Sequence, residues 1–156
     1  MKKDMIAKEL IELDYEVADQ ADFFEKTAKK LFELGYVKDT YCEALKEREA
    51  NYPTALPVEP YPVAIPHADT QHIIKPFIAP VRLKNSVEWC EMANNDEVHQ
   101  VQFVFVLGFL KSDEHIELLQ VLVDNFQDPD LMDKLLKAET ADEYYELVCN
   151  MPGMDE

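Results

Sequence analysis

Prolines constrain this chain of 156 residues more than any other feature. Five of them lie between residues 51 and 66, namely Pro53, Pro57, Pro60, Pro62 and Pro66. Proline fixes its own φ angle, lacks a backbone N–H and disfavours helical geometry in the residue before it, so this segment cannot be helical. We expect a stiff, extended loop that feeds a short strand over residues 63–65 and ends at Pro66, with His67 at the strand end.

Apolar periodicity predicts two helices before this loop. Residues 17–34 carry apolar side chains at helical spacing and are followed by Gly35, which suits the left-handed position after a helix. A second helix should begin after Asp39 and Thr40 and carry Arg48 near its end.

The last third of the chain is also predicted to be helical. Ser112 is placed to cap one helix, Pro129 to open another, and Thr140 with Glu143 to form the capping box of the last. The expected apolar face of the first of these helices consists of Ile116, Leu119, Val123 and Phe126.

Two apolar stretches between the helices are typical of strands. Residues 77–83 and 100–107 are rich in β-branched and aromatic side chains, and the second stretch is apolar enough to lie inside a sheet. The mixed, acidic residues 86–97 are expected to form a connection between them. Helices around a few strands indicate one α/β domain that spans residues 1–156.

The excess of acidic residues limits the kinds of molecule that this chain can bind. Lys and Arg number 15 against 32 Asp and Glu, a net charge of −17 at pH 7 that repels phosphate backbones and anionic membranes. We therefore expect no nucleic-acid partner. The longest apolar run, residues 103–110, is far shorter than the roughly 20 residues that span a bilayer, and no secretion signal opens the chain, so we expect a cytoplasmic protein without membrane insertion.

The glycine and serine positions argue against several enzyme classes. Only three glycines occur and no two are close together, so neither a Gly-rich phosphate cradle nor a nucleotide cofactor is expected. Ser86 lies in the polar connection and Ser112 at a helix start, which argues against a serine hydrolase. Chemistry should therefore rest on other side chains.

Two of the four histidines stand at positions that favour a role. His67 is presented at a strand end, and His115 falls in the first turn of a helix, where the positive end of the helix dipole attracts anions. His72 and His99 lie among polar residues and have no evident partner in the sequence. An imidazole has a pKa near neutrality, which suits it to nucleophilic chemistry without a general base.

A metal site is the rival interpretation of the same segment. His67, Asp69 and His72 form a His-x-Asp-x-x-His pattern of metal-ligand types, although it supplies only three ligands. Asp69 could instead orient an imidazole or simply form a turn.

Three strings of residues resemble the enzyme IIA domain of the bacterial sugar phosphotransferase system. They are Arg-Glu-Ala-Asn-Tyr-Pro-Thr at 48–54, Val-Ala-Ile-Pro-His at 63–67 and His-Ile-Glu-Leu-Leu at 115–119. The likeness covers essentially the whole chain, is to the fructose/mannitol/galactitol class, and is nearest to the galactitol branch. Ala55 and Ala68 stand where the family often has glycine, which predicts a local difference in loop conformation.

The resemblance implies a function and a fold. In that family the residue matching His67 accepts a phosphoryl group from the histidine phosphocarrier HPr and passes it to a cysteine of a IIB component, which serves a membrane IIC component. Arg48 matches the arginine near the active site and His115 a second active-site histidine. A single domain with a mixed sheet of about five strands, flanked by helices on both sides, is implied as well.

We accordingly predict a site made of His67, Arg48 and His115, with Thr54 and Ser112 as supporting phosphate donors and with no cofactor or metal. Arginine suits phosphate because its planar guanidinium forks onto two oxygens and remains charged. A regulatory protein that reports phosphorylation state is an alternative function. The oligomeric state stays open, because an apolar patch around the site would fit either a second copy of the chain in a homo-oligomer or a docking face for HPr or IIB.

Overall fold

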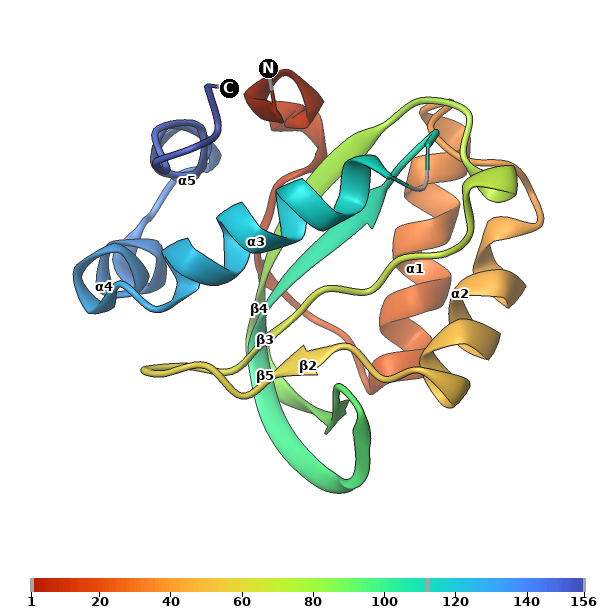
Figure 1. The fold of residues 1–156 in the computed structure, drawn as a ribbon, viewed down its shortest axis with the longest axis horizontal. Helices are drawn as coiled ribbons and strands as arrows, with labels where there is room; N and C mark the ends of the chain where they lie inside the picture. Colours follow the sequence, from red (N-terminus) through yellow and green to blue (C-terminus); the bar gives the residue numbers. More distant parts are fainter. Residues whose placement is uncertain (1, 112, 156) are drawn as a thin grey trace.

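A long β-hairpin forms the centre of the fold. In the computed structural model, which describes residues 2–111 and 113–155, strand β4 (Phe77–Glu91) pairs antiparallel with strand β5 (Asn94–Gly108). The hairpin is strongly bent (Figure 1), and its register shifts between Arg82 and Val87. The prediction that residues 86–97 form a connection is wrong, since most of them extend the two strands.

Three short strands complete a five-stranded mixed sheet. Strand β1 (Glu12–Tyr15) runs parallel to β4, and strand β3 (Val63–Ala64) runs parallel to β5. Strand β2 (Ala55–Leu56) pairs antiparallel with β3 and meets β4 at Glu91, which the bend of the hairpin brings round to it. The expected α/β domain with about five strands is confirmed.

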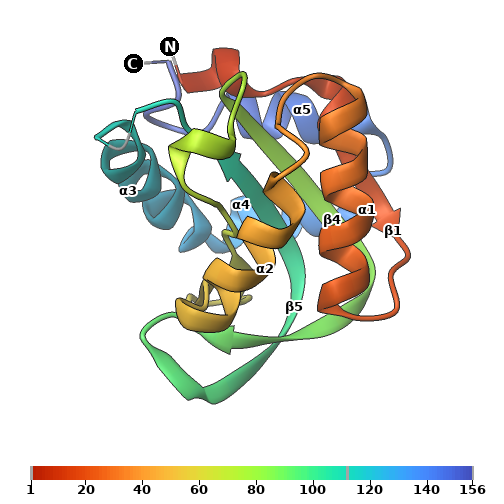
Figure 2. The same cartoon turned by 90° about the vertical axis from the view of Figure 1, so that its right-hand side faces the viewer.

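Helices cover both faces of the sheet (Figures 1 and 2). Helices α1 (Gln20–Glu33) and α2 (Tyr41–Asn51) lie on one face. Helices α3 (Glu114–Phe126), α4 (Pro129–Lys137) and α5 (Ala141–Cys149) lie on the other. Short 3-10 turns occur at η1 (Lys2–Met5), η2 (Lys8–Leu10) and η3 (Thr70–His72). No helix of the described chain has the length and apolar character that crossing a bilayer requires.

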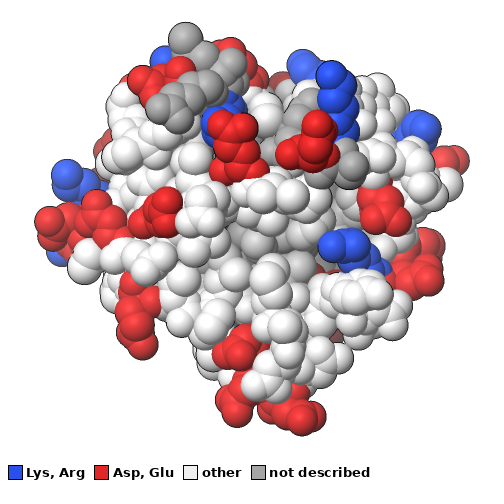
Figure 3. Space-filling view, viewed as in Figure 1, with Lys and Arg blue, Asp and Glu red and all other residues white. Residues whose placement is uncertain are grey.

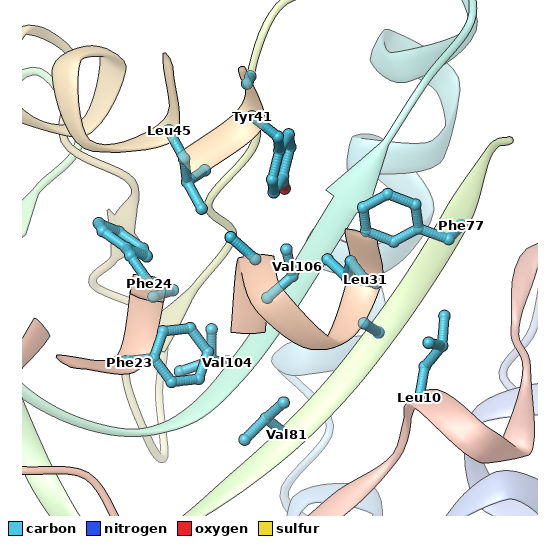
Figure 4. Close-up of a cluster of buried hydrophobic side chains, with 14 of the residues drawn as sticks. Leu10, Phe23, Phe24, Leu31, Tyr41, Leu45, Phe77, Val81, Val104 and Val106 are labelled. Carbon is cyan, nitrogen blue, oxygen red and sulfur yellow. The ribbon is translucent and has the colours of Figure 1, made fainter. Parts of the chain in front are cut away.

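The apolar run in strand β5 is continuous because both faces of this strand are buried. Successive side chains of a strand point to opposite faces, and here both faces are covered by helices. Val104 and Val106 pack with α1 and α2, as Figure 4 shows, whereas Phe103, Phe105 and Leu107 pack with α3, α4 and α5. Each layer of helices therefore closes its own hydrophobic core.

Several local signals of the sequence are realised as predicted. Gly35 follows α1 with a φ of +86°, Pro129 is in the first turn of α4, and the Thr140 side chain caps α5 by accepting a hydrogen bond from the Glu143 N–H. The predicted inner face of α3 is partly wrong: Ile116 is 68% exposed, and Leu118, Leu122 and Phe126 are the buried apolar residues. The predicted cap Ser112 lies outside the described residues.

Candidate functional site

The segment after β3 carries His67 along β5. The Leu107 N–H donates to the Pro66 carbonyl at 3.0 Å, and His67 forms an isolated parallel bridge with Leu107. The strand thus continues past Pro66 for one more pairing, as a proline at the end of a short strand permits. The His67 residue is only 9% exposed, and its backbone is joined to β5 by the bridge with Leu107.

Hydrogen bonds define the tautomer of the His67 ring. Nδ1 lies 2.8 Å from the carbonyl oxygen of Ile65, which can only accept, so Nδ1 carries the proton and donates it. Nε2 is then the nitrogen with the free electron pair. This electron pair accepts a hydrogen bond from Nη2 of Arg48 at 3.3 Å, because a guanidinium can only donate. The nucleophilic atom of the ring is therefore Nε2.

The Arg48 guanidinium comes from the last turn of α2 and is steadied by three neighbours. Besides His67, it lies 5.4 Å above the centre of the Tyr52 ring, and its Nη1 is 3.7 Å from Oδ1 of Asp69. The side chain of Arg48 is 34% exposed, so part of this cation still meets solvent. A guanidinium held in this way is placed to receive an anion next to Nε2 of His67.

A cavity of about 320 Å³ opens where these side chains meet. Its other important wall is His115, in the first turn of α3, whose ring centre is 6.2 Å from that of His67. Phe109 packs against both imidazoles, with ring centres 6.3 Å from His67 and 5.5 Å from His115. The described residues that line the cavity are Arg48, His67, Ala68, Asp69, Thr70, Gln71, Phe109 and His115.

The environment of His67 keeps its ring neutral. Burial is the largest cause that lowers the pKa of this imidazole below 6.5, and the neighbouring Arg48 and His115 side chains lower it further. The Ile65 carbonyl and the Asp69 carboxylate act in the opposite direction without reversing the shift. At neutral pH Nε2 therefore stays unprotonated, and its electron pair is engaged only by the hydrogen bond from Arg48.

The predicted phosphate donor Thr54 has another set of contacts. It is 2% exposed, and its hydroxyl donates to Glu49 Oε1 at 2.7 Å, while its N–H donates to Glu49 Oε2 at 2.7 Å. Its carbonyl accepts from the Ile65 N–H at 3.2 Å. Thr54 thus joins α2 to the strand that leads to His67, instead of lining the cavity.

Glu49 is a buried carboxylate that sequence reasoning missed. It is 5% exposed and also accepts a hydrogen bond from Trp89 Nε1 at 3.0 Å, and burial raises its pKa. No signal in the sequence separates it from the exposed acidic residues of the same helix. Because it anchors the end of α2 beside Arg48, it helps to fix the position of the guanidinium.

The rival metal site is not formed. Nδ1 of His72 lies 2.8 Å from the Thr40 hydroxyl, a contact outside the pattern. Within residues 2–111 and 113–155, no group of three or more His, Cys, Asp or Glu side chains is arranged to hold a metal ion. Ala55 and Ala68 do not adopt the left-handed backbone conformation that favours glycine. The non-glycine residues with positive φ in the described chain are Asp14 and Ala93.

Comparison with known proteins places this chain among sugar phosphotransferase proteins. A family model described as "Phosphoenolpyruvate-dependent sugar phosphotransferase system, EIIA 2" matches residues 4–151. The chain therefore belongs to the EIIA 2 family, whose members are phosphotransferase subunits that carry phosphohistidine.

Individual relatives agree with this assignment. The galactitol-specific EIIA component of Escherichia coli is 29% identical over 118 residues, which cover 76% of this chain and 78% of that protein. The mannitol-specific enzyme IIA component of Staphylococcus aureus is 27% identical over 144 residues, covering 90% of this chain and 92% of that one. Among solved structures, enzyme IIA mannitol of Escherichia coli in complex with phosphorylated IIB mannitol has a TM-score of 0.73 at 21% identity, covering 92% of this chain and 96% of that chain.

Proposed function

We propose that this EIIA protein carries its phosphoryl group on Nε2 of His67, receives it from phospho-HPr and donates it to a cysteine of a IIB component. The observation that supports this proposal is the contact between a neutral, oriented imidazole and a guanidinium on the wall of a surface cavity. The nucleophile needs no general base, because the proton of the ring is already on Nδ1.

In each step of the transfer, one bond to phosphorus forms as another breaks, while Nδ1 of His67 keeps its proton. Nε2 attacks the phosphorus of phospho-HPr, a new P–N bond forms as the old one breaks, and the electron pair of the old bond returns to the donor histidine. The His67 ring then carries positive charge, which the Ile65 carbonyl stabilises through Nδ1–H. In the second step the IIB thiolate attacks phosphorus, and the P–N electrons return to Nε2, which leaves as a neutral imidazole.

Arg48 supplies the compensating charge. A phosphoryl group brings roughly −1.5 to −2 charges to a protein that already has a net charge of −17. One cation about 4 Å from a unit negative charge is worth a gross 4 kcal/mol or so at an effective dielectric near 20. We assign Arg48 to the phosphoryl oxygens and His115 to a hydrogen bond with the same group or to orienting the His67 ring.

The substrate we propose is a sugar or polyol, with galactitol first because the galactitol-specific relatives are among the matches. The complex of enzyme IIA mannitol with phosphorylated IIB mannitol supports a IIB partner here, since the two IIA chains share a fold. We propose that the protein works in the cytoplasm with HPr and a IIB component, upstream of a membrane IIC component.

Phosphorylation in vitro tests the carrier assignment. Incubation with labelled phosphoenolpyruvate, enzyme I and HPr should label the wild type with an acid-labile group, and His67→Ala should abolish the label. His72→Ala is the matched control and should keep it, because His72 contacts Thr40 rather than the cavity. An acid-stable label, or one that survives in His67→Ala, would contradict the assignment.

Growth on single polyols tests the substrate and separates transport from regulation. Deletion of the gene should abolish growth on galactitol but not on glucose if the protein serves uptake, and a His67→Ala copy should not restore it. Unchanged uptake of galactitol, mannitol and fructose in the deletion strain would instead favour the regulatory alternative.

A further inference from the structure

Asp69 is an acidic side chain on the wall of a site that must accept an anion. It lies two residues after His67, and its Oδ1 is 3.7 Å from Nη1 of Arg48. Among the described side chains that line the cavity, Asp69 is the only acidic one. A carboxylate in this position opposes the charge that phosphorylation adds.

A purely local role does not explain this carboxylate. Asp69 occupies the N-cap position of η3, but its side chain makes no capping hydrogen bond, and the turn is closed by the His72 N–H donating to the Asp69 carbonyl at 3.2 Å. The distance to Arg48 exceeds that of a hydrogen bond, so the two interact as charges. The side chain is 71% exposed, which leaves it free to move when another anion arrives.

We propose that Asp69 sets the phosphoryl-transfer potential of His67 by competing for Arg48. The inference rests on the proposed function, since it concerns a phosphoryl group on Nε2. Before phosphorylation Asp69 is paired with the guanidinium, and this pair stabilises the empty carrier. After phosphorylation the new group takes Arg48, and Asp69 is left beside a second anion.

Both effects favour release of the phosphoryl group. Loss of the ion pair and repulsion between carboxylate and phosphoryl each raise the free energy of the phosphorylated protein relative to the free one. The free energy of transfer from HPr to this protein therefore becomes less favourable, and that of transfer onward to the IIB cysteine becomes more favourable. Asp69 is a charge-tuning residue in this scheme, and the reacting atoms remain those of His67.

The equilibrium constants of the two transfers measure the effect. With Asp69→Asn, the constant for transfer from phospho-HPr to this protein should rise about threefold to tenfold, because the exposed charge acts through partly screened solvent. The constant for transfer onward to IIB should fall by the same factor. Their product describes transfer from HPr to IIB alone, so it must stay unchanged and serves as an internal check.

Two control variants separate charge from shape. Asp69→Glu keeps the charge and should restore both constants to within about twofold. Glu47→Gln removes one charge from a residue that lines the neighbouring hollow but not the His67 cavity, and should leave both constants unchanged. The difference between Asp69→Asn and wild type should also shrink in high salt, which a change of packing would not do.

The failures of this inference and of the proposed function are distinguishable. If His67 is labelled in the wild type but Asp69→Asn leaves both constants unchanged, the charge-tuning role is wrong and the carrier function stands. A rise that Asp69→Glu reproduces would likewise overturn it, since the charge would then be irrelevant. If His67 takes no label, the carrier function itself is wrong.

Discussion

At the scale of single residues, His67 is neutral because its surroundings discourage a second proton. Burial and the Arg48 charge lower its pKa below the ordinary 6.5, so the ring keeps the Nε2 electron pair as the pH falls to that value. Protonation at lower pH removes the electron pair. The rate of phosphorylation should therefore hold constant through pH 6.5 and fall only where the lowered pKa is crossed.

Arg48→Ala should change both the titration and the rate. Without the guanidinium the pKa of His67 should rise, and the rate of phosphoryl transfer should fall by about 100-fold or more, as when one donor to a developing charge is removed. The free energy of unfolding should change by less than about 1 kcal/mol, because the acidic partner Asp69 is 71% exposed and its ion pair with Arg48 is long at 3.7 Å.

Imidazole NMR titrations and single-turnover transfer assays would check this prediction. Arg48→Lys is a useful control, since it keeps the positive charge but loses the fork that binds two oxygens, and should recover the pKa more fully than the rate. A pKa of His67 that falls in Arg48→Ala would show that the guanidinium does not act on the ring by its charge.

At the scale of secondary structure, elements with local chemical signals were predictable. Helix and strand ends are specified by local backbone preferences at the prolines, at Gly35 and at the Thr140 capping box. Sequence strings also singled out Arg48, His67 and His115, which the fold brings around one cavity. Such features depend on a few neighbouring residues, so they can be read without the rest of the fold.

The outer half of the hairpin and the Glu49 contacts were not predicted in this way. On the β5 side, residues 94–97 are exposed and polar, so they lack the apolar alternation that marks a half-buried strand. On the β4 side, Val87 and Trp89 do alternate with polar residues and are buried, a strand signal that sequence reasoning missed. The turn between β4 and β5 contains no glycine; Ala93 takes the left-handed conformation with a φ of +65°. Glu49 is buried because Thr54, just after the end of α2, and Trp89, from the distant strand β4, both meet its carboxylate.

Ala93→Gly should stabilise the hairpin. An alanine side chain in the left-handed region is disfavoured by contacts that glycine lacks, and the relief should exceed the added entropy of the unfolded chain. We expect the free energy of unfolding to rise by about 0.5–1 kcal/mol, measured by urea denaturation.

Ala50→Gly is the matched control, because Ala50 is an exposed residue in the last turn of α2. The same substitution there should lower the free energy of unfolding by roughly 0.5–1 kcal/mol. Equal losses at both positions would show that the turn at Ala93 does not have the described backbone conformation.

At the scale of the whole molecule, acidic charge dominates the surface. Figure 3 shows acidic side chains around the edge of one face, whose middle carries few charges. Ion pairs such as Lys84–Glu16 and Lys8–Asp142 are formed by exposed side chains, so each contributes little to stability. The excess acidic side chains behind the net charge of −17 repel one another over longer distances, which destabilises the folded chain.

Salt should therefore stabilise this protein. The Debye length falls from about 30 Å at 0.01 M to about 3 Å at 1 M, so salt removes long-range repulsion that exceeds what the exposed pairs contribute. Between 0.01 M and 0.5 M sodium chloride we expect Tm to rise by roughly 3–6 °C, or about 1–2 kcal/mol for a chain of this size. Thermal unfolding followed by circular dichroism measures it, and potassium chloride should act alike because screening depends on ionic strength. A Tm that falls with salt would mean that local ion pairs outweigh the net charge.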